Sequence, residues 1–211
     1  MIEYIWRING LDVFYTNETN GGGDYFALEY INAVKEFYGS VEHILEWCSG
    51  PGFIGYGMYA SKICNKISFI DKYKPAVEQL YKTKNNDNNI SIYHSESVGI
   101  IPQSVKFDII VGNPPHWENK KDAQKVIPHD NFNDHVEDIL IDPNWQAHSD
   151  FFMNAKFNLA DDGVIFLQEN STGSEPGIFK PLVEKAGLKI STHAQSKMYK
   201  DIYYLEIKHA R

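Results

Sequence analysis

Short apolar runs alternate with longer amphipathic stretches through the middle of the chain. The runs that predict strands cover residues 41–47, 67–70, 90–93, 107–111 and 163–167, and the stretches that predict helices cover 53–63, 75–82 and 150–159. Continuous apolar runs are typical of parallel strands, which are buried on both faces and need a helical crossover between neighbours. The pattern therefore predicts an α/β fold with a doubly wound, Rossmann-like sheet.

The last third of the chain departs from this alternation. A helix is predicted over 176–186 and ends at Gly187, and two strands are predicted over 188–195 and 202–209. Because only residues 196–201 separate these two strands, they must pair antiparallel. We therefore expect a seven-stranded sheet that finishes with an antiparallel C-terminal strand.

The first 40 residues form a pattern of their own. Asn9-Gly10 lies between the apolar runs 2–8 and 11–15 and is typical of a type I′ turn, so a short β-hairpin opens the chain. A helix then continues to Gly39, with apolar residues at roughly helical spacing: Phe26, Leu28, Ile31, Val34 and Phe37 or Tyr38. We interpret 1–40 as an extension and 41–211 as the catalytic core of a single domain spanning 1–211.

Composition narrows the class of protein. The chain has 211 residues, of which 43% are hydrophobic, and this is enough for one full core. The formal net charge of −8 disfavours loose binding to a phosphate backbone. Cys48 and Cys64 are too few for a disulfide framework. No apolar run has the length of a membrane span and no signal peptide is recognisable, so we expect a cytoplasmic protein without a membrane partner.

A glycine-rich loop follows the first predicted parallel strand and opens the next helix. Residues 46–55 read EWCSGPGFIG. Gly50 and Gly52 have no Cβ, so the backbone can approach a ligand closely. In a doubly wound sheet a nucleotide-like ligand binds at this place, although a glycine-rich turn can also form without a ligand.

Polar residues follow the neighbouring predicted strands in the same way. Asp71 ends the second strand, 25 positions after Glu46 (71 − 46), where such folds hold a carboxylate for ribose hydroxyls. Glu96 follows the third strand and Asn113 follows the fourth. Because the carboxyl ends of parallel strands meet at one edge, we expect Glu46, Asp71, Glu96 and Asn113 to line one crevice.

The predicted crevice lacks phosphate-binding residues. No Gly-Lys-Ser or Gly-Lys-Thr motif follows the glycine loop, and the carboxylates would repel a pyrophosphate. A cationic sulfonium fits this surrounding better. We therefore predict S-adenosylmethionine as the cofactor, in preference to ATP or a nicotinamide dinucleotide.

The fourth strand runs directly into Asn113-Pro114-Pro115-His116-Trp117. Proline lacks a backbone N–H and fixes φ, so the strand must stop there. The Asn113 side-chain oxygen and the Pro114 carbonyl are then two acceptors that can hold the hydrogens of a planar nitrogen and make it nucleophilic. The ring of His116 can stack on the planar acceptor, and Trp117 can take over that role if it does not.

A polar segment spanning 118–148 follows. It contains three histidines and three aspartates: His129, His135, His148, Asp130, Asp134 and Asp138. Their spacing matches no familiar ligand motif, so we expect no metal. A long connection in a compact domain usually has a function, and we interpret this one as a substrate-facing lid or recognition loop.

These motifs resemble those of class I S-adenosylmethionine-dependent N-methyltransferases, which carry an acidic-x-Gly-x-Gly-x-Gly loop and an Asn-Pro-Pro-Tyr signature. From Val41 to Arg211 the order of parts is similar to the catalytic domain of release-factor and ribosomal-protein glutamine methyltransferases, including an acidic segment that starts at Asp142. Cys48 stands at the first glycine position and His116 at the tyrosine position. A hairpin and one helix are predicted in the place where the release-factor enzymes have a helical N-terminal domain.

The resemblance implies a role for each residue that matches the family motifs. The implied cofactor-binding residues are Glu46, Cys48, Ser49, Gly50, Gly52, Phe53, Asp71, Lys72, Ser95, Glu96 and Asn113. The implied catalytic residues are Asn113, Pro114 and His116, and Pro115 and Trp117 would contact the substrate. The methyl acceptor would be a macromolecule, either a protein glutamine or a nucleobase of RNA or DNA.

Two alternatives stay open from the sequence. One is an N-methyltransferase that acts specifically on RNA or DNA bases. The other is a degenerate module that binds the cofactor and acts by interaction alone, which Cys48 and His116 would explain. The sequence identifies neither the acceptor nor the oligomeric state.

Overall fold

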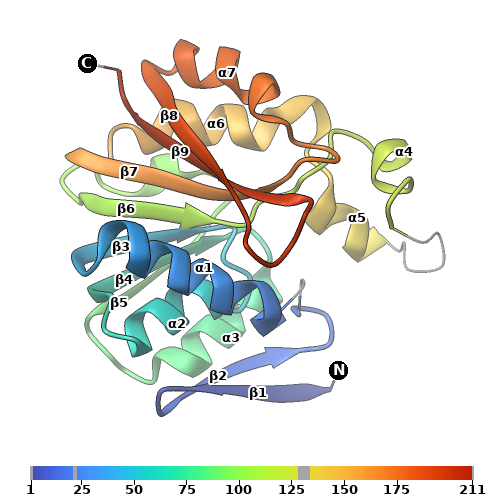
Figure 1. The fold of residues 1–211 in the computed structure, drawn as a ribbon. Helices are drawn as coiled ribbons and strands as arrows, with labels where there is room; N and C mark the ends of the chain where they lie inside the picture. Colours follow the sequence, from blue (N-terminus) through green and yellow to red (C-terminus); the bar gives the residue numbers. More distant parts are fainter. Residues whose placement is uncertain (1, 21–22, 128–133, 211) are drawn as a thin grey trace.

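The computed structural model describes residues 2–20, 23–127 and 134–210, and it has the predicted α/β architecture (Figure 1). One seven-stranded sheet has the order β5-β4-β3-β6-β7-β9-β8. Its strands are β3 (Val41–Trp47), β4 (Cys64–Asp71), β5 (Ile90–His94), β6 (Phe107–Gly112), β7 (Leu159–Asn170), β8 (Leu188–Gln195) and β9 (Ile202–His209). Within this sheet, as far as the structure describes it, β9 pairs antiparallel with β7 and with β8, and the other pairings are parallel. The strand order reverses direction at β3 and β6, where doubly wound sheets bind ligands.

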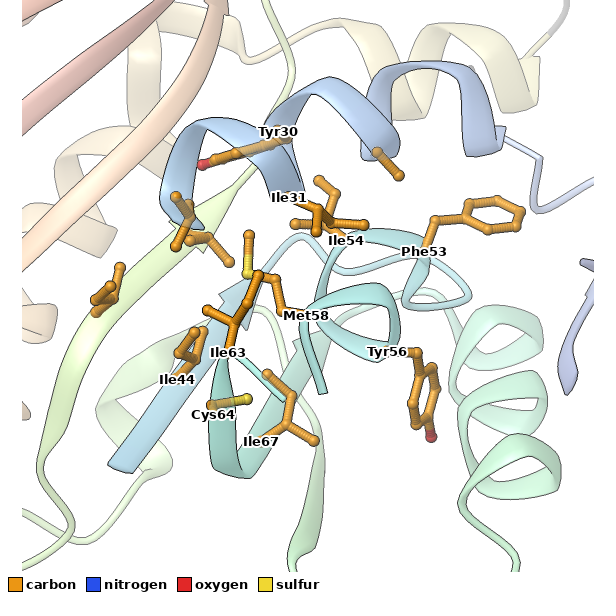
Figure 2. Packing of buried hydrophobic residues seen from close by; sticks show 14 of the residues in the cluster. Tyr30, Ile31, Ile44, Phe53, Ile54, Tyr56, Met58, Ile63, Cys64 and Ile67 are labelled. Atoms are coloured by element: carbon orange, nitrogen blue, oxygen red, sulfur yellow. The ribbon is translucent and has the colours of Figure 1, made fainter. Parts of the chain in front are cut away.

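Helices cover both faces of this sheet. α1 (Gly23–Tyr38), α2 (Phe53–Ala60) and α3 (Lys74–Lys84) lie on one face, and α6 (Gln146–Ala155) and α7 (Pro176–Lys185) lie on the other (Figure 1). Successive strand residues enter two separate cores because side chains alternate between faces. Ile44 packs with α1 and α2, whereas Leu45 packs with α6 and α7. Figure 2 shows the first core, in which Ile31 of α1 lies beside Ile54 of α2.

The N-terminal hairpin forms a separate two-stranded sheet of β1 (Glu3–Ile8) and β2 (Leu11–Thr16). Asn9 and Gly10 both have positive φ, 46° and 85°, as a type I′ turn requires, so the predicted hairpin is confirmed. The hairpin contacts α3, where the Phe14 N–H donates to Thr83 Oγ1 at 3.0 Å.

The buried stripe of α1 differs from the prediction. Ala27, Tyr30, Ile31 and Val34 are buried, whereas Leu28 is 49% exposed and Phe37 is 51% exposed. The helix covers α2 and the sheet with these four residues, and the apolar residues at 28 and 37 lie off that face.

Several boundaries also differ, and β7 begins at Leu159, inside the stretch that the sequence assigns to the preceding helix. α2 ends at Ala60 and β4 begins at Cys64, because Lys62 has φ 59° and turns the chain between them. α6 begins at Gln146 rather than at residue 150, because the Asp142 carboxylate accepts hydrogen bonds from the first turn of the helix.

The segment between β6 and α6 contains helices of its own. These are α4 (Lys120–Ala123), α5 (Asp134–Leu140) and the 3-10 helix η3 (Pro143–Trp145), and a further 3-10 turn, η1 (Val98–Ile100), follows β5. His129 and Asp130, and the side chains of Asp134 and His135, lie outside the described part of the chain. Within the described ranges, no helix is long and apolar enough to cross a membrane.

Candidate active site

The loops that follow β5, β4, β3 and β6 lie along one edge of the sheet. These four strands are neighbours in that order, and their register aligns Asp71 with His94, Trp47 with Ile70 and Trp47 with Gly112. Their carboxyl ends are therefore level. The structure brings the glycine loop, Asp71, the Ser95-Glu96 pair and Asn113 to one edge, as the sequence predicts.

The glycine loop is held by backbone hydrogen bonds. The Ser49 N–H donates to the Ile70 carbonyl at 3.3 Å, and the Gly52 N–H donates to the Ser49 carbonyl at 2.8 Å. Cys48 and Gly50 have φ of 52° and 51°, in the left-handed region that favours glycine. Cys48 thus adopts the backbone conformation of the glycine that the family motif places there.

Gly52 faces the core and not the ligand space. Its φ is 85°, and a Cβ built on it would lie 2.7 Å from Leu80 Cδ2 and from Tyr56 Cδ2. The missing Cβ of Gly52 therefore serves packing against Leu80 and Tyr56, and the close approach of its backbone to a ligand stays a prediction. Gly50 is the open position, because a Cβ there would meet nothing closer than the Thr19 carbonyl oxygen at 4.0 Å.

Phe53 is also used by the core. Its ring packs edge-on against Trp6 and Tyr15 of the hairpin, with ring centroids 5.5 and 5.0 Å away. Figure 2 shows this ring at the margin of the first core, turned away from α1. The contact of Phe53 with a cofactor stays a prediction.

Glu46 is buried and holds the start of α2. Its Oε2 accepts a hydrogen bond from the Gly55 N–H at 2.8 Å. Burial raises the pKa of Glu46 well above its ordinary value, the Gly55 hydrogen bond opposes that rise, and the charge of Asp71 adds to it. A cation bound at this edge would relieve the proximity of the two carboxylates.

Asp71 lies between the glycine loop and the start of α3. Oδ2 accepts from the Gly50 N–H and Oδ1 accepts from the Tyr73 N–H, both at 2.7 Å. Burial raises the pKa of Asp71, against these two hydrogen bonds. Each carboxylate oxygen keeps a further acceptor position, which is what a vicinal diol requires. The neighbouring Lys72 is exposed, and its carbonyl accepts from His94.

Ser95 and Glu96 both follow β5, and they differ in their contacts and exposure. The Ser95 hydroxyl bridges to the backbone of Ser97, donating to its carbonyl and accepting from its N–H at 3.0 Å. Glu96 is exposed. The structure places Glu96 at the predicted edge, and its contact with the cofactor stays a prediction.

The Asn113 side chain presents an unpaired acceptor. Its Oδ1 is buried and has no hydrogen-bond partner among the described residues. A buried polar atom without a partner costs free energy, so such atoms are uncommon and often belong to a site that a ligand completes. Asn113 directly follows β6, and the buried Pro114 comes next.

His116 and Trp117 are both buried, with 8% and 4% of their surface exposed. The Trp117 backbone pairs with the far end of the segment that starts at 118: its N–H donates to the Leu140 carbonyl, and its carbonyl accepts from the Asp142 N–H at 2.8 Å. The two ends of the segment between Trp117 and Asp142 therefore lie side by side. Pro115 is half-buried between the acceptor residues and this closure.

Three residues near the site were not predicted to belong to it. His148 Nδ1 lies 2.7 Å from Asp142 Oδ2, His148 Nε2 lies 3.3 Å from Glu169 Oε1, and His116 Nδ1 lies 3.3 Å from Glu169 Oε2. We call Asp142, His148, Glu169 and His116 the carboxylate–histidine chain. The sequence carried a weak signal for it, since Glu169 falls just past the fifth predicted strand.

Burial and hydrogen bonding have opposite effects on the pKa values in the carboxylate–histidine chain. Burial favours the neutral form of His148, but hydrogen bonds to Asp142 and Glu169 outweigh it and raise the pKa of His148. Burial also opposes ionisation of Glu169, yet hydrogen bonds from His116 and His148 hold its pKa below the ordinary value. The pKa of Asp142 is lowered in the same way, by His148 and by the helix N–H groups, against burial. The two carboxylates therefore favour the charged form of His148.

A family model described as "Methyltransferase small domain" matches residues 20–140, more than half of the chain. No curated protein sequence matches it. Among solved structures, a ribosomal protein L11 methylase from Lactobacillus delbrueckii subsp. bulgaricus has a TM-score of 0.61 at 11% identity, covering 90% of this chain and 81% of that one.

Two further structures are similar in fold. A TehB-like SAM-dependent methyltransferase from Corynebacterium glutamicum has a TM-score of 0.57 at 14% identity, over 87% of this chain and 88% of that one. A 16S rRNA N2 methyltransferase from T. thermophilus, in complex with AdoMet and guanosine, has a TM-score of 0.60 at 19% identity. That match covers all of this chain and 50% of the other.

Proposed function

The chain belongs to the methyltransferase small domain family, and on that premise we propose that it transfers the methyl group of S-adenosylmethionine to a planar nitrogen. The nitrogen is either a glutamine side-chain amide of a protein or an exocyclic amine of a nucleobase. The observation that carries this proposal is the buried, unpartnered Oδ1 of Asn113. An acceptor atom kept free at the end of β6 suits a substrate that brings N–H donors.

The cofactor residues fit this donor. Gly50 leaves open space, Asp71 has free acceptor positions for ribose hydroxyls, and two neighbouring carboxylates suit a cation. When bound, S-adenosylmethionine supplies an electrophilic methyl group on a sulfonium. The loops after β3, β4 and β5 contribute further polar residues at this edge, namely Ser49, Lys72, Ser95 and Glu96. Cys48 supplies the left-handed backbone conformation of the glycine loop.

The methyl-acceptor residues do the remaining work. The lone pair of an amide or aromatic amine nitrogen is delocalised, so the nitrogen is a poor nucleophile. Asn113 Oδ1 and the Pro114 carbonyl would accept its two hydrogens and favour a tetrahedral, nucleophilic geometry. Pro115, His116 and Trp117 continue from this pair and form the wall of the pocket in our proposal.

A nucleobase of RNA is the specific alternative to a protein glutamine. The similarity to a 16S rRNA N2 methyltransferase solved with guanosine favours it. The net charge of −8 weighs against extensive phosphate contacts. In either case we propose a macromolecular acceptor and a single methyltransferase domain spanning 1–211.

Asn113→Ala tests the proposal. The labelled methyl group of S-adenosylmethionine is followed into protein and RNA fractions of a cell extract, and cofactor affinity is measured by titration calorimetry. We expect turnover to fall about 100-fold with little change in affinity, because the lost acceptor acts mainly in the transition state. Asn65→Ala is the control, since Asn65 is exposed at the opposite end of β4 and pairs with Glu42.

Two outcomes would contradict the proposal. If the Asn113 variant transfers methyl groups at the wild-type rate, Asn113 only terminates a strand and the planar-nitrogen chemistry fails. If the wild-type protein binds the cofactor but labels neither fraction, the degenerate interaction module is the better description.

A further inference from the structure

The carboxylate–histidine chain connects the proposed pocket to the interior. His116 belongs to the loop after β6, Glu169 to the end of β7, and His148 to α6. Glu169 uses one oxygen for each histidine, at 3.3 Å in both cases. Glu169 and His148 are fully buried, and His116, at 8% exposed, is the member that reaches the surface.

Because Glu169 is ionised, it determines which ring nitrogen of His116 carries the hydrogen. An ionised carboxylate has no hydrogen to donate, so each ring nitrogen that faces Glu169 must be the donor. His116 therefore carries a hydrogen on Nδ1. In the neutral ring, Nε2 is then left with its lone pair, and Nε2 makes no hydrogen bond to any residue that the structure describes.

Among the described residues, the groups around the carboxylate–histidine chain are uncharged rings, one thiol and hydroxyls, with the charges of Asp71, Lys72 and Glu175 beyond them. Trp47 of β3, Trp145 and Phe152 around α6, and Phe179 of α7 surround His148 with uncharged rings. Burial raises the pKa of the Cys48 thiol and of the Tyr30 and Tyr203 hydroxyls, and Glu169 adds to each rise. Asp71 faces Cys48, and Glu175 faces Tyr203.

We propose that Glu169, supported by His148 and Asp142, is a positioning residue that fixes the His116 tautomer, so that His116 Nε2 accepts the proton released by the methylated nitrogen. This inference rests on the proposed N-methyl transfer. It also gives a reason for histidine at the position where the related motif has tyrosine, because a phenol is a weak proton acceptor at neutral pH.

The proton step balances without another reactant. After methyl transfer the acceptor nitrogen has one extra bond and a positive charge. An N–H bond breaks, its electron pair stays on that nitrogen, and the proton forms a bond with Nε2. His116 becomes an imidazolium whose Nδ1–H faces the Glu169 carboxylate, which stabilises this charge, and solvent later takes the proton.

Nitrogen NMR of the imidazole rings in the full chain tests the positioning role without a substrate. In the wild-type protein we expect the neutral form of His116 to carry its hydrogen on Nδ1. Glu169→Gln should remove this preference, whereas the control Glu175→Gln, an exposed carboxylate nearby, should leave it. A wild-type His116 with its hydrogen on Nε2 would overturn the proposal even if Glu169→Gln did not fold.

The rate of labelled-methyl transfer separates this inference from the proposed function. We expect Glu169→Gln to lower turnover about 100-fold with unchanged cofactor affinity, and to flatten the pH profile of the rate. Transfer that needs Asn113 but is the same in Glu169→Gln at every pH would reject the positioning role and keep the proposed function. Transfer to no nitrogen acceptor, with the Nδ1–H tautomer present, would reject the proposed function instead.

Discussion

Two aspartates in this fold make the same backbone contacts at opposite ends of the sheet. Asp71 accepts from the N–H groups of Gly50 and Tyr73, and Asp108 Oδ2 accepts from those of Glu42 and His43 at 2.9 Å. Only Asp71 lies at the carboxyl edge, beside the glycine loop. Asp71 is thus a candidate for cofactor binding because of its position, whereas Asp108 has a structural role at the other edge.

Asp71→Asn should weaken the binding of S-adenosylmethionine by about 1–3 kcal/mol, because a neutral amide is a poorer acceptor for a ribose diol. Asp108→Asn is the matched control and should leave the dissociation constant unchanged. Titration calorimetry measures both. Equal affinities for Asp71→Asn and the wild-type protein would remove Asp71 from the cofactor site.

Helices and strands position these residues, and α1 is hydrogen-bonded to the end of β6, just before Asn113. The Tyr30 hydroxyl accepts from the Gly112 N–H at 3.1 Å and lies within donating distance of the Gly112 and Phe166 carbonyls. Gly112 immediately precedes Asn113. The helix that the sequence assigns to an extension therefore holds the end of β6 in place.

Tyr30→Phe should destabilise the fold by about 1–3 kcal/mol, since buried backbone groups would lose their partner. It should also lower methyl transfer, because the Asn113 acceptor would no longer be fixed. Tyr38→Phe on the same helix is the control, as Tyr38 pairs with Glu206 far from the acceptor loop. Urea denaturation and the labelled-methyl assay measure the two effects, and a Tyr30 variant as stable and active as the Tyr38 variant would refute the connection.

Periodicity predicts elements well here and side-chain direction less well. The alternation of apolar runs gives the sheet, its antiparallel end and the edge where the loops meet, because these follow from strand order. It does not predict that a Cβ at Gly52 would point into the core, where it would meet Leu80 and Tyr56. It also misses Tyr30 and the Glu169–His148 contact, because residues so far apart in sequence meet only after the sheet has formed.

On the scale of the whole molecule, the carboxylate–histidine chain couples folding to pH. The pKa of His148 is raised above its ordinary 6.5 in the folded protein. Its contribution to the free energy of unfolding is therefore complete below about pH 6.5 and is lost as the pH rises through the folded value. Asp142 and Glu169 have lowered pKa values, so their contributions are present above their ordinary range and are lost as the pH falls through the folded values.

These directions predict that the cluster stabilises the protein most between about pH 4.5 and 6.5, where all three groups keep the ionisation that pairing favours. Nitrogen NMR should find that His148 loses its proton at a higher pH than an unperturbed imidazole does. His43 is the internal control, because burial lowers the pKa of this half-buried ring and it should lose its proton at a lower pH. Urea denaturation should give a smaller free energy of unfolding at pH 8.5 than at pH 6. A His148 that loses its proton below pH 6.5 would mean that burial outweighs its two carboxylates, and the chain could then not hold His116 in the way we propose.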